Sequence, residues 1–114
     1  MASQSRRSFQ PRAYRDVRPY PEPPESLADL TGPTVGIIEL PIVIDWGPRR
    51  RYDLGKETDR RIVYERVLRE AATPQDLVRF VNAASLIDIW NRLWLPIPIR
   101  LRWEERFPEL SAAA

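Results

Sequence analysis

The chain has 114 residues, a net charge of +2 at pH 7, and neither cysteine nor histidine. A chain of this length has room for one domain. The two missing residue types exclude disulfides, thiolate nucleophiles, imidazole bases and the usual zinc ligands. Because small secreted domains often need disulfides, we expect a cytoplasmic protein.

No targeting signal and no membrane segment are predicted. Arg6 and Arg7 resemble the start of a signal peptide, but no apolar run follows them. The most apolar stretch, residues 35–46, is interrupted by Glu39, Pro41 and Asp45. It is too short and too polar to cross a bilayer, so we expect no membrane partner.

Residues 1–31 are predicted to form a basic, proline-rich arm. Few aliphatic side chains are present, so the segment cannot bury enough surface to offset its ordering entropy. It is therefore either a disordered, solvated leader or an extended arm bound to a partner. The candidate arm contacts are the interspersed arginine and aromatic residues Arg6, Arg7, Phe9, Arg12, Tyr14, Arg15 and Arg18.

Residues 32–54 are predicted to form an extended strand followed by an arginine-rich connector. Alternate positions over residues 34–46 are apolar, which predicts one buried strand face consisting of Ile38, Leu40, Ile42, Ile44 and Trp46. Pro41 removes a hydrogen-bond donor, so the strand lies at an edge or bends there. The strand can fold back near Pro41, pair with residues 50–54, or add to another chain, and the sequence does not decide between these.

The connector is the first candidate binding site, because tryptophan and arginine are frequent at interface hot spots. The same cluster could contact a phosphate backbone. Alternatively it is a solvated loop whose tryptophan packs inward. Its members are Trp46, Arg49, Arg50, Arg51 and Tyr52.

Residues 55–110 are predicted to be helical, which gives a mainly α fold of three to four helices. The first helix runs from about residue 56 or 58 to 71, with Tyr64 at the margin of its apolar stripe. Thr73 is the expected N-cap of a second helix that ends near residue 81. Asn82 stops it, and Ser85 caps a third helix that runs to Trp94.

The third helix is apolar over most of its girth, so it is either the centre of the core or buried partly by a partner. Trp90 and Trp94 are accordingly candidate contacts as well as candidate core residues. Residues 97–107 fit a strand and a helix, and Glu104, Glu105 and Arg106 favour the helix. Residues 111–114 are expected to be a frayed end.

No catalytic arrangement is found, so we expect a protein that is not an enzyme and holds no metal or cofactor. The four glycines never cluster into a phosphate-binding loop. Each serine and threonine lacks a histidine base, and the single lysine, Lys56, lies in a charged turn. The acidic residues are explained as caps and salt bridges.

Several segments resemble a group of small proteins from GC-rich bacteria. They are residues 45–48, 52–54, 59–61, 64–70, 86–90, 93–96 and 102–104, and the match covers roughly residues 35–110. Proteins of this group look like antitoxins encoded beside nucleotidyltransferase toxins of the abortive-infection type. The resemblance implies that the chain binds a toxin that adds nucleotides to tRNA, and that it blocks the toxin's active site or tRNA surface.

Three hypotheses about function follow. The first is an antitoxin-like neutraliser whose partner is a cognate nucleotidyltransferase toxin. The second is a nucleic-acid-binding module that uses the arginines of the arm and connector, with steep salt dependence. The third is a structural subunit of a larger assembly. The sequence does not reveal the oligomeric state.

Overall fold

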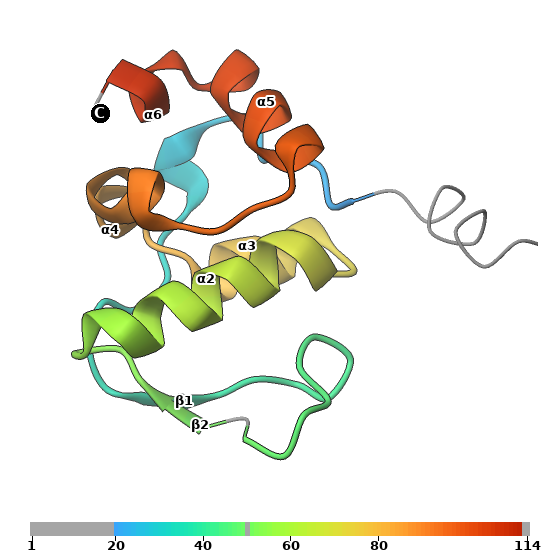
Figure 1. The fold of residues 1–114 in the computed structure, drawn as a ribbon, viewed down its shortest axis with the longest axis vertical. Coiled ribbons are helices and arrows are strands. Elements are labelled where there is room, and N and C mark those ends of the chain that lie inside the picture. The colour runs from blue at the N-terminus through green and yellow to red at the C-terminus, as the bar shows by residue number, and fades with distance from the viewer. Residues whose placement is uncertain (1–19, 50, 113–114) are drawn as a thin grey trace, which may run out of the picture.

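The computed structural model describes residues 20–49 and 51–112 and has a mainly helical fold that follows a two-stranded hairpin. Helix α2 crosses the middle of the molecule, with the hairpin on one side and α5 and α6 on the other (Figure 1). The predicted fold class is confirmed. The elements are η2 (Leu27–Asp29), β1 (Ile37–Glu39), β2 (Arg51–Asp53), α2 (Glu57–Glu70), α3 (Pro74–Phe80), α4 (Ala83–Ile89), η3 (Trp90–Arg92), α5 (Ile97–Arg106) and α6 (Pro108–Ala112).

The predicted strand pairs with a second strand of the same chain. β1 and β2 pair antiparallel, with Ile38 opposite Tyr52. Pairing with residues 50–54 was one of three predicted possibilities, and this structure adopts it within one chain.

The predicted strand over residues 34–46 is wrong in length, because the chain bends at Pro41. The N–H groups of Ile44 and Asp45 both donate to the Pro41 carbonyl, at 2.9 and 3.0 Å. This turn interrupts the two-residue period, so the predicted buried face is only partly formed. Ile44 is buried, whereas Ile42 is 60% exposed and Trp46 is 79% exposed.

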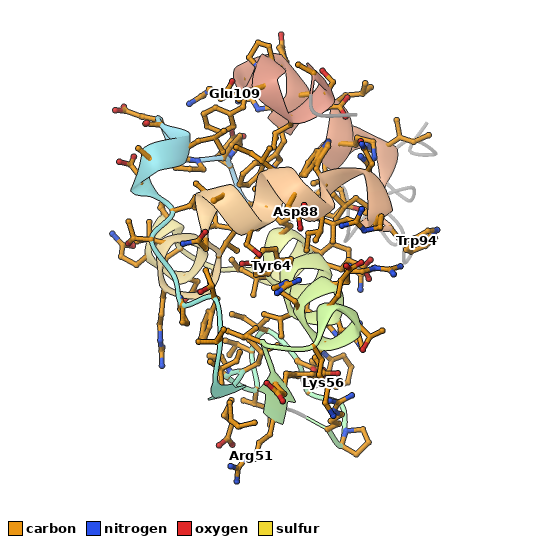
Figure 2. The ribbon with its side chains drawn as sticks, turned by 90° about the vertical axis from the view of Figure 1, so that its left-hand side faces the viewer. Arg51, Lys56, Tyr64, Asp88, Trp94 and Glu109 are labelled. Atoms are coloured by element: carbon orange, nitrogen blue, oxygen red, sulfur yellow. The ribbon has the colours of Figure 1, made fainter. Side chains whose placement is uncertain are left out.

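The apolar stripe of α2 forms one wall of the core. Val63, Val67 and Leu68 are fully buried, and so is Tyr64, which the sequence placed at the margin. The Tyr64 hydroxyl accepts the N–H of Asn82 at 3.1 Å. A satisfied hydroxyl explains how a tyrosine can lie fully inside the core. Figure 2 shows its position between the helices.

The helix starts follow local side-chain chemistry. Thr73 caps α3 as predicted, accepting the N–H of Asp76 at 3.4 Å. The predicted cap of the third helix is wrong by three residues: Asn82 is the N-cap of α4, and its Oδ1 accepts the Ser85 N–H at 3.1 Å. The Asn82 Nδ2 also donates to the Gly32 carbonyl at 3.2 Å, so one side chain joins the helix start to the N-terminal segment.

The centre of the core lies where α4 and η3 meet α5. Trp90 is fully buried and its ring lies 6.2 Å from that of Trp103, which in turn lies 5.8 Å from Phe107. Residues 97–106 are helical, as the acidic pair near the end of this segment predicted. The third predicted helix, residues 85–94, instead ends at Ile89 and tightens into η3, which places Trp90 inside and Trp94 outside.

The N-terminal segment joins the domain earlier than predicted. Leu27 and Leu30 are buried, and the Leu30 carbonyl accepts the Ala83 N–H at 2.9 Å. Glu22 forms a salt bridge of 2.5 Å with Arg102 of α5. Residues 20–31 are therefore a strap across the helices, and the predicted arm is shorter than 31 residues. All seven candidate arm contacts fall within residues 1–19, outside the described part of the chain.

Candidate functional site

Two exposed tryptophans flank the outward face of α2. Trp46 lies on the hairpin side and is 79% exposed, and Trp94 lies on the α5 side and is 73% exposed. Figure 2 shows Trp94 projecting from the edge of the molecule. In Figure 1, α2 runs between the hairpin and the segment that leads into α5. We call this surface the two-tryptophan face. It consists of Trp46, Trp94 and the α2 residues beside them, Glu65, Arg66, Arg69 and Glu70.

The Trp46 side of this face is fixed by a buried carboxylate next to the tryptophan. Asp45 is 5% exposed and accepts the Gly47 N–H at 3.2 Å. Its other oxygen accepts a hydrogen bond from the buried Tyr52 hydroxyl. The Arg66 Nε of α2 lies 3.5 Å from Asp45 Oδ1. The residues on both sides of Trp46 therefore belong to one network that ties the loop to β2 and α2.

A second carboxylate holds the other end of the loop. Asp59, in the first turn of α2, accepts the Asp53 N–H at 2.9 Å and Arg49 Nη2 at 2.6 Å. The Arg49 guanidinium also lies over the Tyr52 ring, 4.5 Å from its centroid. The Asp59 carboxylate accepts the outward-facing N–H of Asp53, so the first turn of α2 covers that edge of β2.

Electrostatics show that this network favours ionised carboxylates beside neutral tyrosine. Burial opposes ionisation of Asp45, but the hydrogen bonds from Tyr52 and Gly47 and the charge of Arg66 outweigh it, so its pKa lies below the ordinary value. Burial and the neighbouring Asp45 raise the pKa of Tyr52. The bonds from Asp53 and Arg49 lower the pKa of Asp59. At neutral pH the loop is thus held by charge-assisted hydrogen bonds.

A hollow of about 380 Å³ lies beside Trp46. Three of its lining residues are charged side chains of α2. The lining residues are Ile44, Asp45, Trp46, Gly47, Arg66, Arg69 and Glu70. An open hollow of this kind, with an exposed indole at its rim, suits a protruding side chain of a partner better than an enclosed substrate.

The Trp94 side is tied to the same helix. Glu65 Oε2 accepts the Trp94 N–H at 2.7 Å. Arg69 lies one helical turn beyond Glu65, on the same stripe of α2, and lines the Trp46 hollow. One stripe of α2 therefore carries a residue that holds Trp94, Glu65, and a residue that lines the Trp46 hollow, Arg69.

Other apolar side chains extend the surface at both ends. Around Trp46 the loop exposes Ile42 and Val43, and beyond Trp94 the helix α5 exposes Ile97 and Leu101. Exposed apolar residues scattered singly are normal on proteins, but groups that adjoin each other indicate interaction sites.

The residues of the predicted binding site differ in whether they are exposed or buried. Trp46, Arg49, Arg51 and Trp94 are exposed, and Figure 2 shows Arg51 pointing outward from β2. Tyr52 is buried as an anchor of the loop. Arg50 lies outside the described residues.

Trp90 cannot contact a partner in this conformation, because its surface is fully covered. Its Nε1 donates to Glu104 at 2.8 Å, and Arg100 lies 5.0 Å from the centre of its ring. It is a core residue, and its assignment as a contact is corrected.

Sequence reasoning placed Asp45 among salt-bridged acids but missed that it positions the adjacent tryptophan. An aspartate followed two residues later by glycine is a turn signal that could have found it.

Within residues 20–49 and 51–112, no group of three or more acidic side chains is arranged to hold a metal ion. In the same part of the chain, no helix has the length and apolar character needed to cross a membrane.

Comparison with protein-family models, with curated proteins and with solved structures finds no match to this chain.

Proposed function

We propose that this chain is a non-catalytic protein that binds and neutralises a partner enzyme through the two-tryptophan face. The observation that carries the proposal is the presentation of Trp46. The loop is anchored by buried Asp45 and by Asp59, yet its indole remains 79% exposed. A rigid loop that displays a large apolar side chain lowers the entropy lost on binding. Tryptophan is also among the residues that contribute most at interface hot spots.

For the identity of the partner, we propose a nucleotidyltransferase toxin that acts on tRNA. This choice rests on the sequence resemblance over residues 35–110. The two-tryptophan face supports it in one respect, since apolar anchors with charged residues between them suit a protein surface. We assign the cytoplasm as the place of action because such a toxin meets its tRNA there.

The test uses the purified product of the adjacent gene and measures transfer of nucleotides to tRNA as this chain is added. The wild-type chain is expected to suppress transfer and to co-elute with the enzyme at a fixed ratio. Trp46→Ala and Trp94→Ala should each weaken suppression at least ~30-fold, as expected for hot-spot residues.

Gln75→Ala serves as the control, since Gln75 is exposed at the start of α3, which lies behind α2 in Figure 1. It should suppress transfer like the wild type. Co-elution without suppression would argue for a structural subunit. If no complex forms at micromolar concentrations, the proposal is wrong.

A further inference from the structure

The hollow beside Trp46 contains an arginine that has no acceptor of its own. Arg69 lies in the last turn of α2, at the end of the helix nearest the loop of the hairpin (Figure 1). It lines the hollow together with the exposed indole of Trp46. Its side chain is half-buried, yet within residues 20–49 and 51–112 it forms no hydrogen bond and no ion pair.

The acid that would be expected to pair with Arg69 is bonded elsewhere. Glu65 lies four residues earlier, at the spacing of a helical ion pair. Its Oε2 instead accepts the Trp94 N–H at 2.7 Å. The helix dipole favours a cation in the last turn of α2, which accounts for the positive charge of Arg69 but supplies no acceptor for its N–H groups. The contact that holds Trp94 therefore leaves Arg69 available to an acceptor from outside the chain.

The other charged residues of the hollow already have partners. Asp45 accepts the Tyr52 hydroxyl, and its second oxygen lies 3.5 Å from the Nε of Arg66. Glu70, the other acid that lines the hollow, also has a partner. Among the described residues that line this hollow, Arg69 is the cation left for an external anion.

We propose that Arg69 binds a carboxylate of the partner protein, on a segment whose neighbouring apolar side chain packs against Trp46. This inference rests on the proposed function and adds the chemistry of the partner's contact. A guanidinium can donate two parallel hydrogen bonds to one carboxylate, which fixes the position of the segment as well as adding binding energy. An indole packed beside this ion pair excludes water and strengthens the pair by lowering the local dielectric.

The surroundings of Arg69 favour a protein carboxylate over the phosphate backbone of a nucleic acid. Glu65 and Glu70 lie on either side of it along α2 and would repel a chain of phosphates. The loop of the hairpin also exposes Ile42 and Val43, and such aliphatic side chains offer no contact to phosphate. A single carboxylate flanked by apolar groups pairs with the arginine without that repulsion.

The experiment measures the dissociation of full-length variants from the immobilised product of the adjacent gene. Arg69→Gln removes the charge and the forked donors, so it should dissociate at least ~30-fold faster than the wild type. Arg69→Lys keeps the charge but loses the fork, so its dissociation rate should lie between these two. Arg79→Gln is the matched control, because Arg79 is exposed on α3 and its loss changes the net charge equally. It should dissociate like the wild type.

The urea midpoint of Arg69→Gln should equal the wild-type value, because the Arg69 side chain forms no bond within the described part of the chain. Faster dissociation of this variant then reports a lost contact with the partner. Equal dissociation rates for Arg69→Gln and Arg79→Gln would overturn the carboxylate contact and leave the proposed function intact. An affinity for purified tRNA that exceeds the affinity for the protein and falls in Arg69→Gln would overturn it as well. A wild-type chain that forms no complex at all would contradict the proposed function and this inference together.

Discussion

Replacing Tyr52 by phenylalanine tests whether the Asp45 network fixes the Trp46 loop. The substitution removes one hydroxyl and keeps the buried ring, together with its contact to Arg49. The hydroxyl bonds to Asp45 and lies 2.8 Å from the Arg49 carbonyl. A hydrogen bond to a buried charged group contributes about 1.5–3 kcal/mol, so we expect Tyr52→Phe to lower the free energy of unfolding by about 2 kcal/mol at pH 7. With an unchanged slope, the urea midpoint should fall by roughly 1 M.

The same substitution should change how stability depends on pH. The pKa of Asp45 is lower in the folded chain than its ordinary value. Its ionisation therefore adds stability that is complete above the unfolded pKa of about 3.9 and is lost as the pH falls through the folded pKa. Since Tyr52 supports that ionisation, the deficit of Tyr52→Phe should narrow as the pH falls from about 5 through the lowered folded pKa of Asp45.

Tyr64→Phe is the matched control, because Tyr64 is also a buried residue but its hydroxyl bonds to the neutral N–H of Asn82. It should cost about 0.5–1.5 kcal/mol, and the cost should not depend on pH over this range. A Tyr52→Phe deficit below 0.5 kcal/mol at pH 7, or one that is the same at both ends of the range, would refute the reasoning.

Three further substitutions and one control test other parts of the fold by urea unfolding. Asp59→Asn removes the charge that holds Arg49 and should cost about 1–2 kcal/mol at pH 7, with the cost shrinking as the pH falls because the pKa of Asp59 is lowered. Gly32→Ala should cost about 1–3 kcal/mol, because the added Cβ would lie 2.7 Å from backbone atoms at the end of α3. Asn82→Ala removes the cap of α4 and should cost about 1–2 kcal/mol, whereas Ser85→Ala should cost little because Ser85 contributes only its N–H to that cap.

The helical half of the fold was predictable because its determinants are local. Thr73 and Pro74 set the start of α3 through capping chemistry that acts within one turn. The apolar period of α2 gave its length, Glu57–Glu70, to within about two residues. The acidic pair near the end of α5 correctly favoured a helix over a strand.

The parts that sequence reasoning missed depend on contacts between distant residues. The strap over residues 20–31 is held by bonds to residues 82, 83, 102 and 106, which no local pattern could indicate. Pro41 indicated either an edge strand or a bend, but the alternation of apolar residues continues past it, so the sequence did not choose the bend that the bonds to the Pro41 carbonyl form. Asn82 caps α4 through its Oδ1, which accepts the Ser85 N–H, and its Nδ2 also donates to Gly32, fifty residues earlier.

The candidate site was only half predictable for the same reason. All four tryptophans are large and apolar, so composition does not separate those that face inward from those that face outward. Trp90 and Trp103 are buried because α4, η3 and α5 close around them. Trp46 is held outside by the turn in which Asp45 accepts the Gly47 N–H. Trp94 is held outside by the bond from its own N–H to Glu65.

The most direct test of the central claim is amide hydrogen exchange of the full chain with and without the product of the adjacent gene. Binding through the two-tryptophan face predicts slower exchange in the loop at residues 41–48 and in the segment at residues 93–97. It predicts no change in the exposed start of α3, near residue 75. Slower exchange confined to α3, or a complex that leaves both tryptophan-bearing segments unprotected, would contradict the claim.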